Sequence, residues 1–306
     1  MTRWTGNWDD FGMDTISLAG PLEAKLEAIA GAGFTQVMLS ARDLASHPEG
    51  IAAACRAVRA SGLRVTGFQV LRDFEALTGR LHEYKMDVAK SMLDLCAEVG
   101  AGVLLVCSST LVHAANDRAR IARDLRKLAM LAVPRGIRIA YEALSWGRTI
   151  NELRAAWDVV ERAAAPNLGL GFDSFHCLAT RTAPSELDAI DARKIWLVQL
   201  SDFLWREVRS PEERIETARH FRVFPGEGVH TAEIADMVRR LVASGYRGDF
   251  SFEVFNDDYV QLAPSFVAAR ARRAAEWLGE EVLQRPVPLP SGLPRGPVRA
   301  SRERIP

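Results

Sequence analysis

The sequence has no excess of charge of either sign and no long apolar run. Lys and Arg number 39 and Asp and Glu number 39, so the formal net charge is zero. A nucleic-acid coat or an anionic membrane surface attracts chains whose Lys and Arg gather in excess, and a bilayer span takes about 20 apolar residues. The start, MTRWTGNWDD, lacks the basic-then-apolar order of a secretory signal. We therefore expect a cytoplasmic globular protein that binds neither nucleic acid nor membrane.

Cysteine and histidine are also scarce. The four cysteines form no CxxC pair, and the six histidines complete no zinc-finger spacing. Since these cysteines fall within helix-like or apolar segments, buried free thiols are the favoured interpretation, with a thiolate nucleophile as the lesser alternative. They are Cys55, Cys96, Cys107 and Cys177.

Short apolar runs rich in β-branched residues alternate with longer amphipathic stretches. Eight runs are expected to be strands: Met13–Leu18, Gln36–Ser40, Leu63–Val70, Gly102–Cys107, Ile137–Glu142, Leu168–Asp173, Ile195–Leu200 and Phe250–Val254. The expected helices are Leu22–Ala32, Ile51–Ser61, His82–Val99, Asp117–Val133, Ile150–Ala164, a segment within Pro184–Arg193, Ala232–Ala243 and Pro264–Leu278.

This alternation predicts a single (β/α)8 TIM barrel over residues 1–282. Strands that alternate with helices pair in parallel through right-handed crossovers. A doubly wound open sheet is the alternative, but no glycine-rich phosphate turn follows the first expected strand. Residues 283–306 are rich in Pro, Arg and Gly without apolar periodicity, which predicts a disordered or surface-bound tail.

Four successive expected strands end in a side chain that carries oxygen. In a TIM barrel these ends meet at the active-site face. A single such residue is commonly a solvated loop residue, but three carboxylates and an amide together would repel one another without a cation. Oxygen ligands suit Mg, Mn or Co, whereas zinc prefers thiolates and imidazoles. The sequence therefore predicts a site for one divalent ion at Glu142, Asp173, Gln199 and Glu253.

Two further segments place basic groups near this face. His176 lies three residues after Asp173, where a metal-binding or acid–base role and a structural role are equally supported. The segment RHFRVFPGEG is expected to be a basic loop whose arginines, Arg219 and Arg222, either hold a carboxylate or hydroxyl of a ligand or lie on the surface.

The third and fourth expected strands add polar groups to the same rim. Gln69 and Arg72 follow the third strand, where Arg72 either binds an anion or neutralises Asp73 and Glu75. Ser108 follows the fourth strand and is expected to hydrogen-bond substrate. No His–acid pair at recognisable spacing supports a nucleophilic serine triad.

These motifs resemble the xylose-isomerase-like barrel superfamily of sugar phosphate isomerases and epimerases. Within it, the chain is most similar to the bacterial metal-dependent 3-dehydroshikimate dehydratases. The likeness covers roughly residues 12–280 and is carried by FQVLRDFE, YEALSWG, NLGLGFDSFH, VQLSDF, RHFRVFPGEG and FSFEVFND.

The resemblance implies a lyase that removes water from 3-dehydroshikimate through an enolate and gives protocatechuate. Catalysis would then depend on His176 for proton transfer and on Arg72 and Arg222 to orient the substrate. The substrate-binding set would comprise Gln69, Arg72, Ser108, His176 and Arg222. One divalent ion, with Mn, Mg or Co expected, would be held by the four strand-end residues named above and would stabilise the developing negative charge.

The chain departs from the dehydratases around the pocket. Ser40 and Arg42 stand where they carry acidic residues, Val70 and Leu71 replace their Pro-Phe, and Leu144 occupies the place of a histidine found in some relatives. The ligand pattern is intact, so these departures affect the substrate rather than the ion.

Other readings therefore stay open. A sugar or cyclitol isomerase, an epimerase or an inosose-type dehydratase could use the same ion on a small polyhydroxylated ketone or carboxylate. A non-enzymatic binding barrel is a further alternative, and a homo-oligomer formed through the outer helices is compatible with the sequence. The three-zinc apurinic endonucleases on this barrel are disfavoured, because six histidines and zero net charge provide neither the ligands nor a basic groove.

Overall fold

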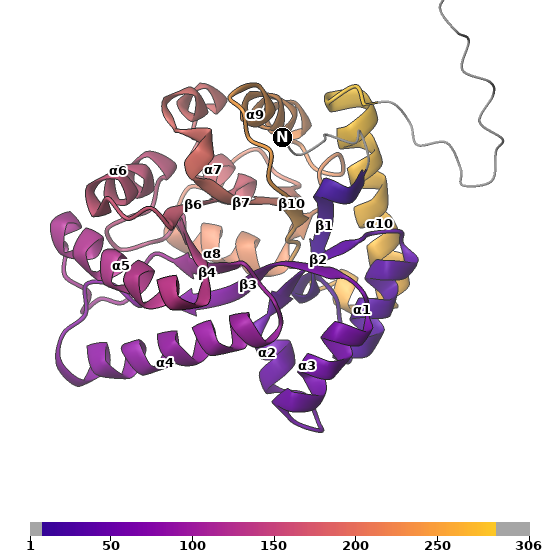
Figure 1. Ribbon diagram of the computed structural model, residues 1–306. Helices are drawn as coiled ribbons and strands as arrows, with labels where there is room; N and C mark the ends of the chain where they lie inside the picture. Colours follow the sequence, from indigo (N-terminus) through magenta and orange to yellow (C-terminus); the bar gives the residue numbers. More distant parts are fainter. Residues whose placement is uncertain (1–7, 286–306) are drawn as a thin grey trace, which may run out of the picture.

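The computed structural model describes residues 8–285, in which eight parallel strands close into a barrel (Figure 1). Around the barrel the strands follow the order β1-β10-β7-β6-β5-β4-β3-β2. Their bounds are β1 Phe11–Asp14, β2 Gln36–Ser40, β3 Arg64–Arg72, β4 Val103–Cys107, β5 Arg138–Glu142, β6 Leu168–Asp173, β7 Ile195–Leu200 and β10 Phe250–Phe252. The predicted TIM barrel is confirmed.

Helices surround the strands on the outside of the barrel (Figure 1). Their bounds are α1 Leu22–Gly31, α2 Ala41–Ala45, α3 Ile51–Ala60, α4 Gly79–Glu98, α5 Arg118–Ala132, α6 Leu153–Ala163, α7 Ser174–Ala179, α8 Pro211–His220, α9 Thr231–Ala243 and α10 Pro264–Trp277. The last helix, α10, packs beside α1 and completes the ring. None of the helices within residues 8–285 is long and apolar enough to cross a membrane.

Aromatic side chains fill part of the core next to β1. The ring of Phe11 stacks on those of Phe250 and Phe252, with centroid separations of 5.4 and 6.1 Å. All three side chains are buried, and burying one such side chain contributes roughly 1.5–3 kcal/mol. This packing anchors the first strand to the last and so helps to close the barrel.

The chain beyond the last helix stays against the barrel until the end of the described residues. Leu283 packs against the core, and both terminal nitrogens of Arg285 donate to the carboxylate of Asp10 over 2.6 and 2.7 Å. The rest of the predicted tail, residues 286–306, lies outside the described residues.

The first strand was misplaced by the sequence pattern. Met13–Leu18 was predicted, but β1 ends at Asp14 and a 3-10 helix follows over Thr15–Ser17. The Asp14 carboxylate accepts a hydrogen bond from the backbone N–H of Ile16 and so caps this helix. Asp commonly competes with strand pairing in this way, and an apolar run alone does not reveal it.

Other elements differ in length or were missed. The third strand continues to Arg72, the last ends at Phe252, and Pro184–Arg193 contains two 3-10 turns, Pro184–Ala189 and Ala192–Lys194, instead of an α-helix. Three helices were not predicted: α2, α7 and α8. The short α2 and α7 each begin directly at the end of a strand, where no loop signals a boundary.

The helix α8 and two short strands form an insertion at the barrel mouth. β8, Asp202–Phe203, pairs antiparallel with β9, Arg222–Val223. The helix between them starts with a capping box, in which the Ser210 hydroxyl accepts from the N–H of Glu213 and the Glu213 carboxylate accepts from that of Ser210. The segment predicted as a basic loop is therefore partly regular: Arg219 lies in the last turn of α8 and Arg222 begins β9.

Candidate metal and substrate site

The four predicted ligands lie at the carboxyl ends of neighbouring strands. Glu142 and Asp173 end β5 and β6, Gln199 is the penultimate residue of β7, and Glu253 directly follows β10. Asp173 pairs in register with Gln199, which pairs in turn with Ser251 of β10. All four predicted ligands are buried, so the fold brings them to one side of the barrel mouth.

His176 joins two of these carboxylates. It lies in the first turn of α7, directly after β6, and its Nε2 is 3.9 Å from Glu142 Oε2 and 3.7 Å from Asp173 Oδ2. One ligand atom from each of the three residues lies within 4.8 Å of the others, and all three are buried. These separations bring the two carboxylates within reach of one small cation, with the imidazole beside it.

The donor set contains polar atoms that the described part of the protein leaves without partners. Neither Nε2 nor Oε1 of Gln199 makes a hydrogen bond, and Glu142 Oε1 makes none either. A buried, unsatisfied polar group costs about 1–3 kcal/mol, so it points to a partner beyond the protein. The free oxygens of these two residues, set among further carboxylates, are suitable ligands for a hard divalent ion. The residues present therefore fit the expected metal.

Arg222 neutralises part of this acidic cluster. Its Nη1 donates to Asp173 Oδ2 over 2.8 Å and to Glu253 Oε2 over 3.0 Å. Its Nε donates to the carbonyl of Ala218 over 2.9 Å, and the guanidinium lies 4.4 Å from the ring centre of Phe175. The side chain is buried and held on several sides, so it acts as a fixed countercharge.

The environment favours the neutral forms of the clustered carboxyls. Burial raises the pKa of Glu142 well above its usual range, and the neighbouring Asp173 and Glu253 raise it further. Burial also raises the pKa of Asp173 and of Glu253, against the opposing effect of Arg222. A divalent cation would relieve this repulsion.

His176 is kept neutral and in one tautomer. Burial lowers the pKa of His176 well below its usual range, and the positive charge of Arg222 lowers it further. The backbone N–H of Ser145 donates to Nδ1 over 3.2 Å, so Nδ1 is an acceptor and the neutral ring carries its proton on Nε2. That proton faces the site, where the ring can donate it.

Asp14 belongs to the same cluster and was missed by sequence reasoning. It ends β1, is completely buried, and accepts a hydrogen bond from Gln69 Nε2. Burial raises its pKa well above the usual range, and the charge of Glu253 adds to the shift. The rule applied to the other strand ends would have found Asp14, but the predicted strand ran four residues past it.

Cys107 is a second group whose position the sequence did not reveal. All four cysteines are free and buried, as predicted. The thiol of Cys107 also donates to Glu142 Oε2 over 3.0 Å, and the two residues are paired across β4 and β5. Burial raises the pKa of Cys107 well above its usual range, and Glu142 raises it further. The thiol therefore supports a predicted ligand, and its surroundings disfavour the thiolate form.

A cavity of about 180 Å³ opens above the cluster. All five predicted substrate-binding residues line it: Gln69, Arg72, Ser108, His176 and Arg222. Glu142 and Glu253 form part of its wall, whereas Asp173 lines a smaller adjoining cavity together with Glu142 and His176. Gln199 lines neither and is completely buried beneath them. The predicted metal and substrate residues thus share one region of the mouth.

Hydrogen bonds join the loop after β3 to the loop after β4. Glu75 Oε1 accepts from the N–H of Ser109 over 2.6 Å and from the hydroxyl of Tyr141 over 3.0 Å, and Asp73 Oδ1 accepts from the N–H of Thr110 over 2.8 Å. Burial raises the pKa of Glu75 to about 7. Among the described residues, no ion pair joins Arg72 to Asp73 or Glu75, whose Oδ1 and Oε1 atoms accept these hydrogen bonds instead.

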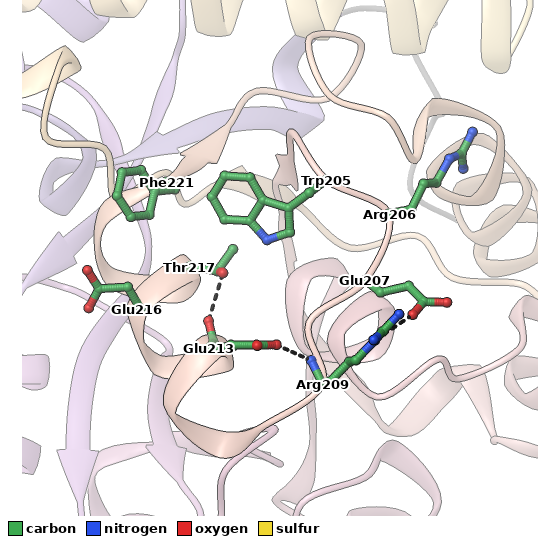
Figure 2. Close-up of a pocket in the computed structure, with 8 residues that line it drawn as sticks. All are labelled: Trp205, Arg206, Glu207, Arg209, Glu213, Glu216, Thr217 and Phe221. Atoms are coloured by element: carbon green, nitrogen blue, oxygen red, sulfur yellow. Dashed lines mark hydrogen bonds and ion pairs between the residues drawn. The ribbon is translucent and has the colours of Figure 1, made fainter.

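A wider hollow of about 610 Å³ lies on the other side of α8 (Figure 2). Trp205 and Phe221 face each other there with ring centres 5.5 Å apart. Its charged groups are engaged locally: Arg209 pairs with Glu207, and the carboxylate of Glu213 accepts from the backbone N–H of Arg209. The helix α8 is thus a wall with this hollow on one side and the 180 Å³ cavity on the other.

The family model described as "Xylose isomerase-like TIM barrel" matches residues 26–281. The chain belongs to this family. A 3-dehydroshikimate dehydratase from Pseudomonas aeruginosa is 41% identical over 280 residues, covering 90% of this chain and 43% of that protein. The same-named protein of Pseudomonas putida is 38% identical, covering 87% of this chain and 41% of that protein. The chain thus spans less than half the length of these two relatives.

Other members of the family include a solved structure of double length. It is described as a fusion of a xylose isomerase-like TIM barrel with a 4-hydroxyphenylpyruvate dioxygenase. It superposes with a TM-score of 0.83 at 36% identity and covers 90% of this chain and 43% of its own. An inosose isomerase of Halalkalibacterium halodurans is more distant, with 30% identity over 45% of this chain and 47% of its own length.

Proposed function

We propose that this chain is a divalent-metal-dependent dehydratase that converts 3-dehydroshikimate to protocatechuate. The observation that carries the proposal is the buried set Glu142, Asp173, Gln199 and Glu253, whose Gln199 amide has no partner among the described residues. Two relatives that match most of this chain are named for that reaction. The oxygen-rich donor set favours Mn, Mg or Co.

Glu142, Asp173, Gln199 and Glu253 would hold the ion. When bound, the ion would act as a Lewis acid toward the substrate ketone and increase the acidity of the neighbouring C–H. His176 adjoins the set as a hydrogen-bond donor, since Ser145 occupies its Nδ1.

The proton transfers of the reaction are carried out by the protein's own acids and bases. A base breaks the C–H bond next to the ketone and takes the proton, the β-hydroxyl leaves with its electron pair, and a donor protonates it to water. Tautomerisation of the product then gives the aromatic catechol. We assign the donor role to the Nε2–H of His176.

We assign the base role to Asp73. Asp73, Glu142 and Glu253 are the carboxyl residues among those that line the 180 Å³ cavity, and Asp73 alone lies outside the expected ligand set. Its Oδ1 accepts from Thr110, which leaves Oδ2 for the substrate. Arg72 and Arg222 would orient the ring, with Gln69 and Ser108 completing the substrate contacts.

The test is product identification with two substrates. Purified protein with Mn, Mg or Co is given 3-dehydroshikimate or an inosose, and the products are identified by NMR. The proposal predicts protocatechuate from the first and little turnover of the second. Turnover of the inosose alone would favour the second candidate, a cyclitol enzyme on the same site, to which the likeness to an inosose isomerase points.

A further inference from the structure

The three arginines beside the substrate cavity are not equivalent. Arg222 is buried and has committed Nη1 to Asp173 and Glu253 and Nε to the carbonyl of Ala218. A guanidinium whose charge is already compensated by two carboxylates has little attraction left for a third. A carboxylate on the ligand therefore needs another cation.

Arg72 and Arg219 are available cations. Both line the 180 Å³ cavity and both are exposed. Within residues 8–285, neither guanidinium takes part in a hydrogen bond, an ion pair or a ring contact. The nearest acid along α8, Glu216, lines the wider hollow (Figure 2), and no ion pair joins it to Arg219 among the described residues.

The two arginines approach the cavity from different elements. Arg72 is the last residue of β3, and Arg219 lies in the last turn of α8. Both arginines line the same cavity as Glu253. Cations from both elements thus face a cavity whose inner wall is acidic.

This polarity sets the orientation of a ligand. Glu142 and Glu253 line the inner wall, which presents acidic groups, whereas the guanidiniums of Arg72 and Arg219 attract an anionic group. Arg presents planar, paired N–H donors that match a carboxylate. The volume is below the roughly 300–1,000 Å³ of sites for drug-sized ligands, which suits a single ring.

We propose that Arg219, together with Arg72, binds the carboxylate of the substrate and makes the site selective for carboxylate-bearing rings over neutral cyclitols. The identification of the ring as 3-dehydroshikimate depends on the proposed function, but the recognition of a carboxylate does not. Arg219 is then a specificity-determining residue, while Arg222 organises the acidic cluster.

The decisive experiment compares two ligands that differ only in the carboxylate. Calorimetry measures the binding of protocatechuate and of catechol to the full chain with Mn. A hydrogen bond to a charged group contributes about 1.5–3 kcal/mol, or roughly 10- to 150-fold in affinity. We expect wild type to prefer protocatechuate at least tenfold, and Arg219→Gln to lose most of that preference while its catechol affinity stays within twofold.

Two variants serve as comparisons. Arg126→Gln removes the same charge from an exposed position on α5 and should bind both ligands as wild type does. Arg219→Lys retains the charge but not the paired donors and should fall between wild type and Arg219→Gln. Either a wild type without preference for protocatechuate or an unchanged preference in Arg219→Gln would overturn the proposal, as would equal losses for both ligands.

Kinetics separate this role from a structural one and from the proposed function. With 3-dehydroshikimate, Arg219→Gln should raise KM at least tenfold with kcat within about threefold, because the contact exists before and during the reaction. If wild type does not turn over 3-dehydroshikimate but still prefers protocatechuate through Arg219, the proposed function fails and the carboxylate site stands.

Discussion

Arg222 Nη1 donates to Asp173 Oδ2 over 2.8 Å, and both groups are buried at the barrel mouth. Replacing Arg222 by Gln leaves buried carboxylates without their countercharge, and breaking such a pair typically costs about 3–5 kcal/mol. We predict a loss of this order in the free energy of unfolding of metal-free Arg222→Gln, measured by urea denaturation. Saturating Mn should reduce the loss, since the ion provides the missing positive charge. Equal losses with and without Mn would contradict this interpretation of Arg222.

Gln199→Leu tests whether the unpartnered amide of Gln199 is a ligand of the metal ion. Leu has a similar volume and removes a buried polar group without partners, whose burial costs about 1–3 kcal/mol. The metal-free variant should therefore be at least as stable as wild type, yet it should bind Mn at least tenfold more weakly in calorimetry. If Mn affinity is unchanged, Gln199 is not a ligand. Gln261→Leu, at an exposed position outside the cavity lining, is the control.

Glu75 predicts a specific dependence of stability on pH. Its pKa in the folded protein is about 7, raised from 4.5 mainly by burial. Between these values the native state holds the proton more tightly than the unfolded state, so stability falls as pH rises. The free energy of unfolding of wild type should fall with pH across this range, whereas that of Glu75→Gln should not. We therefore expect the variant's free energy of unfolding, relative to that of wild type, to rise by about 3 kcal/mol from pH 4.5 to pH 8. A difference between the two proteins that is constant with pH would exclude this assignment.

Asp73→Asn tests the assigned base. The amide keeps an oxygen for the hydrogen bonds from Thr110 but cannot accept the substrate proton. General-base catalysis typically contributes about 10²- to 10⁴-fold, so kcat with 3-dehydroshikimate should fall within that range while KM and Mn affinity stay close to wild type. A thermal melt reports whether the loop remains folded. Wild-type kcat in a folded variant would assign the base elsewhere.

The architecture could be predicted because its signals are local and repeated. Apolar strands alternate with amphipathic helices, and the rule that barrel sites lie at strand ends places Glu142, Asp173 and Glu253 on one face from the sequence alone. Each of these residues lies at the end of an apolar run, and the run ends close to the point where the observed strand ends.

The groups that sequence reasoning missed depend on contacts that an apolar pattern does not reveal. Asp14 was hidden inside a predicted strand that ran too far, because its hydrogen bond to Ile16 N–H is invisible in an apolar pattern. The contact of the Cys107 thiol with Glu142 depends on the pairing of β4 with β5. The contacts of Arg222 with Asp173 and Glu253 depend on the insertion that carries α8 and β9, which the sequence pattern did not reveal.

The most direct test of the account is the metal dependence of product formation. Protein freed of metal by a chelator is mixed with 3-dehydroshikimate and titrated with Mn while the absorbance of the catechol product is followed. We expect no product before addition of Mn, a rise in absorbance that saturates with the ion, and no rise in a variant carrying both Glu142→Ala and Glu253→Ala. Product formation at the full rate in the chelated protein, or none with Mn, Mg or Co, would contradict it.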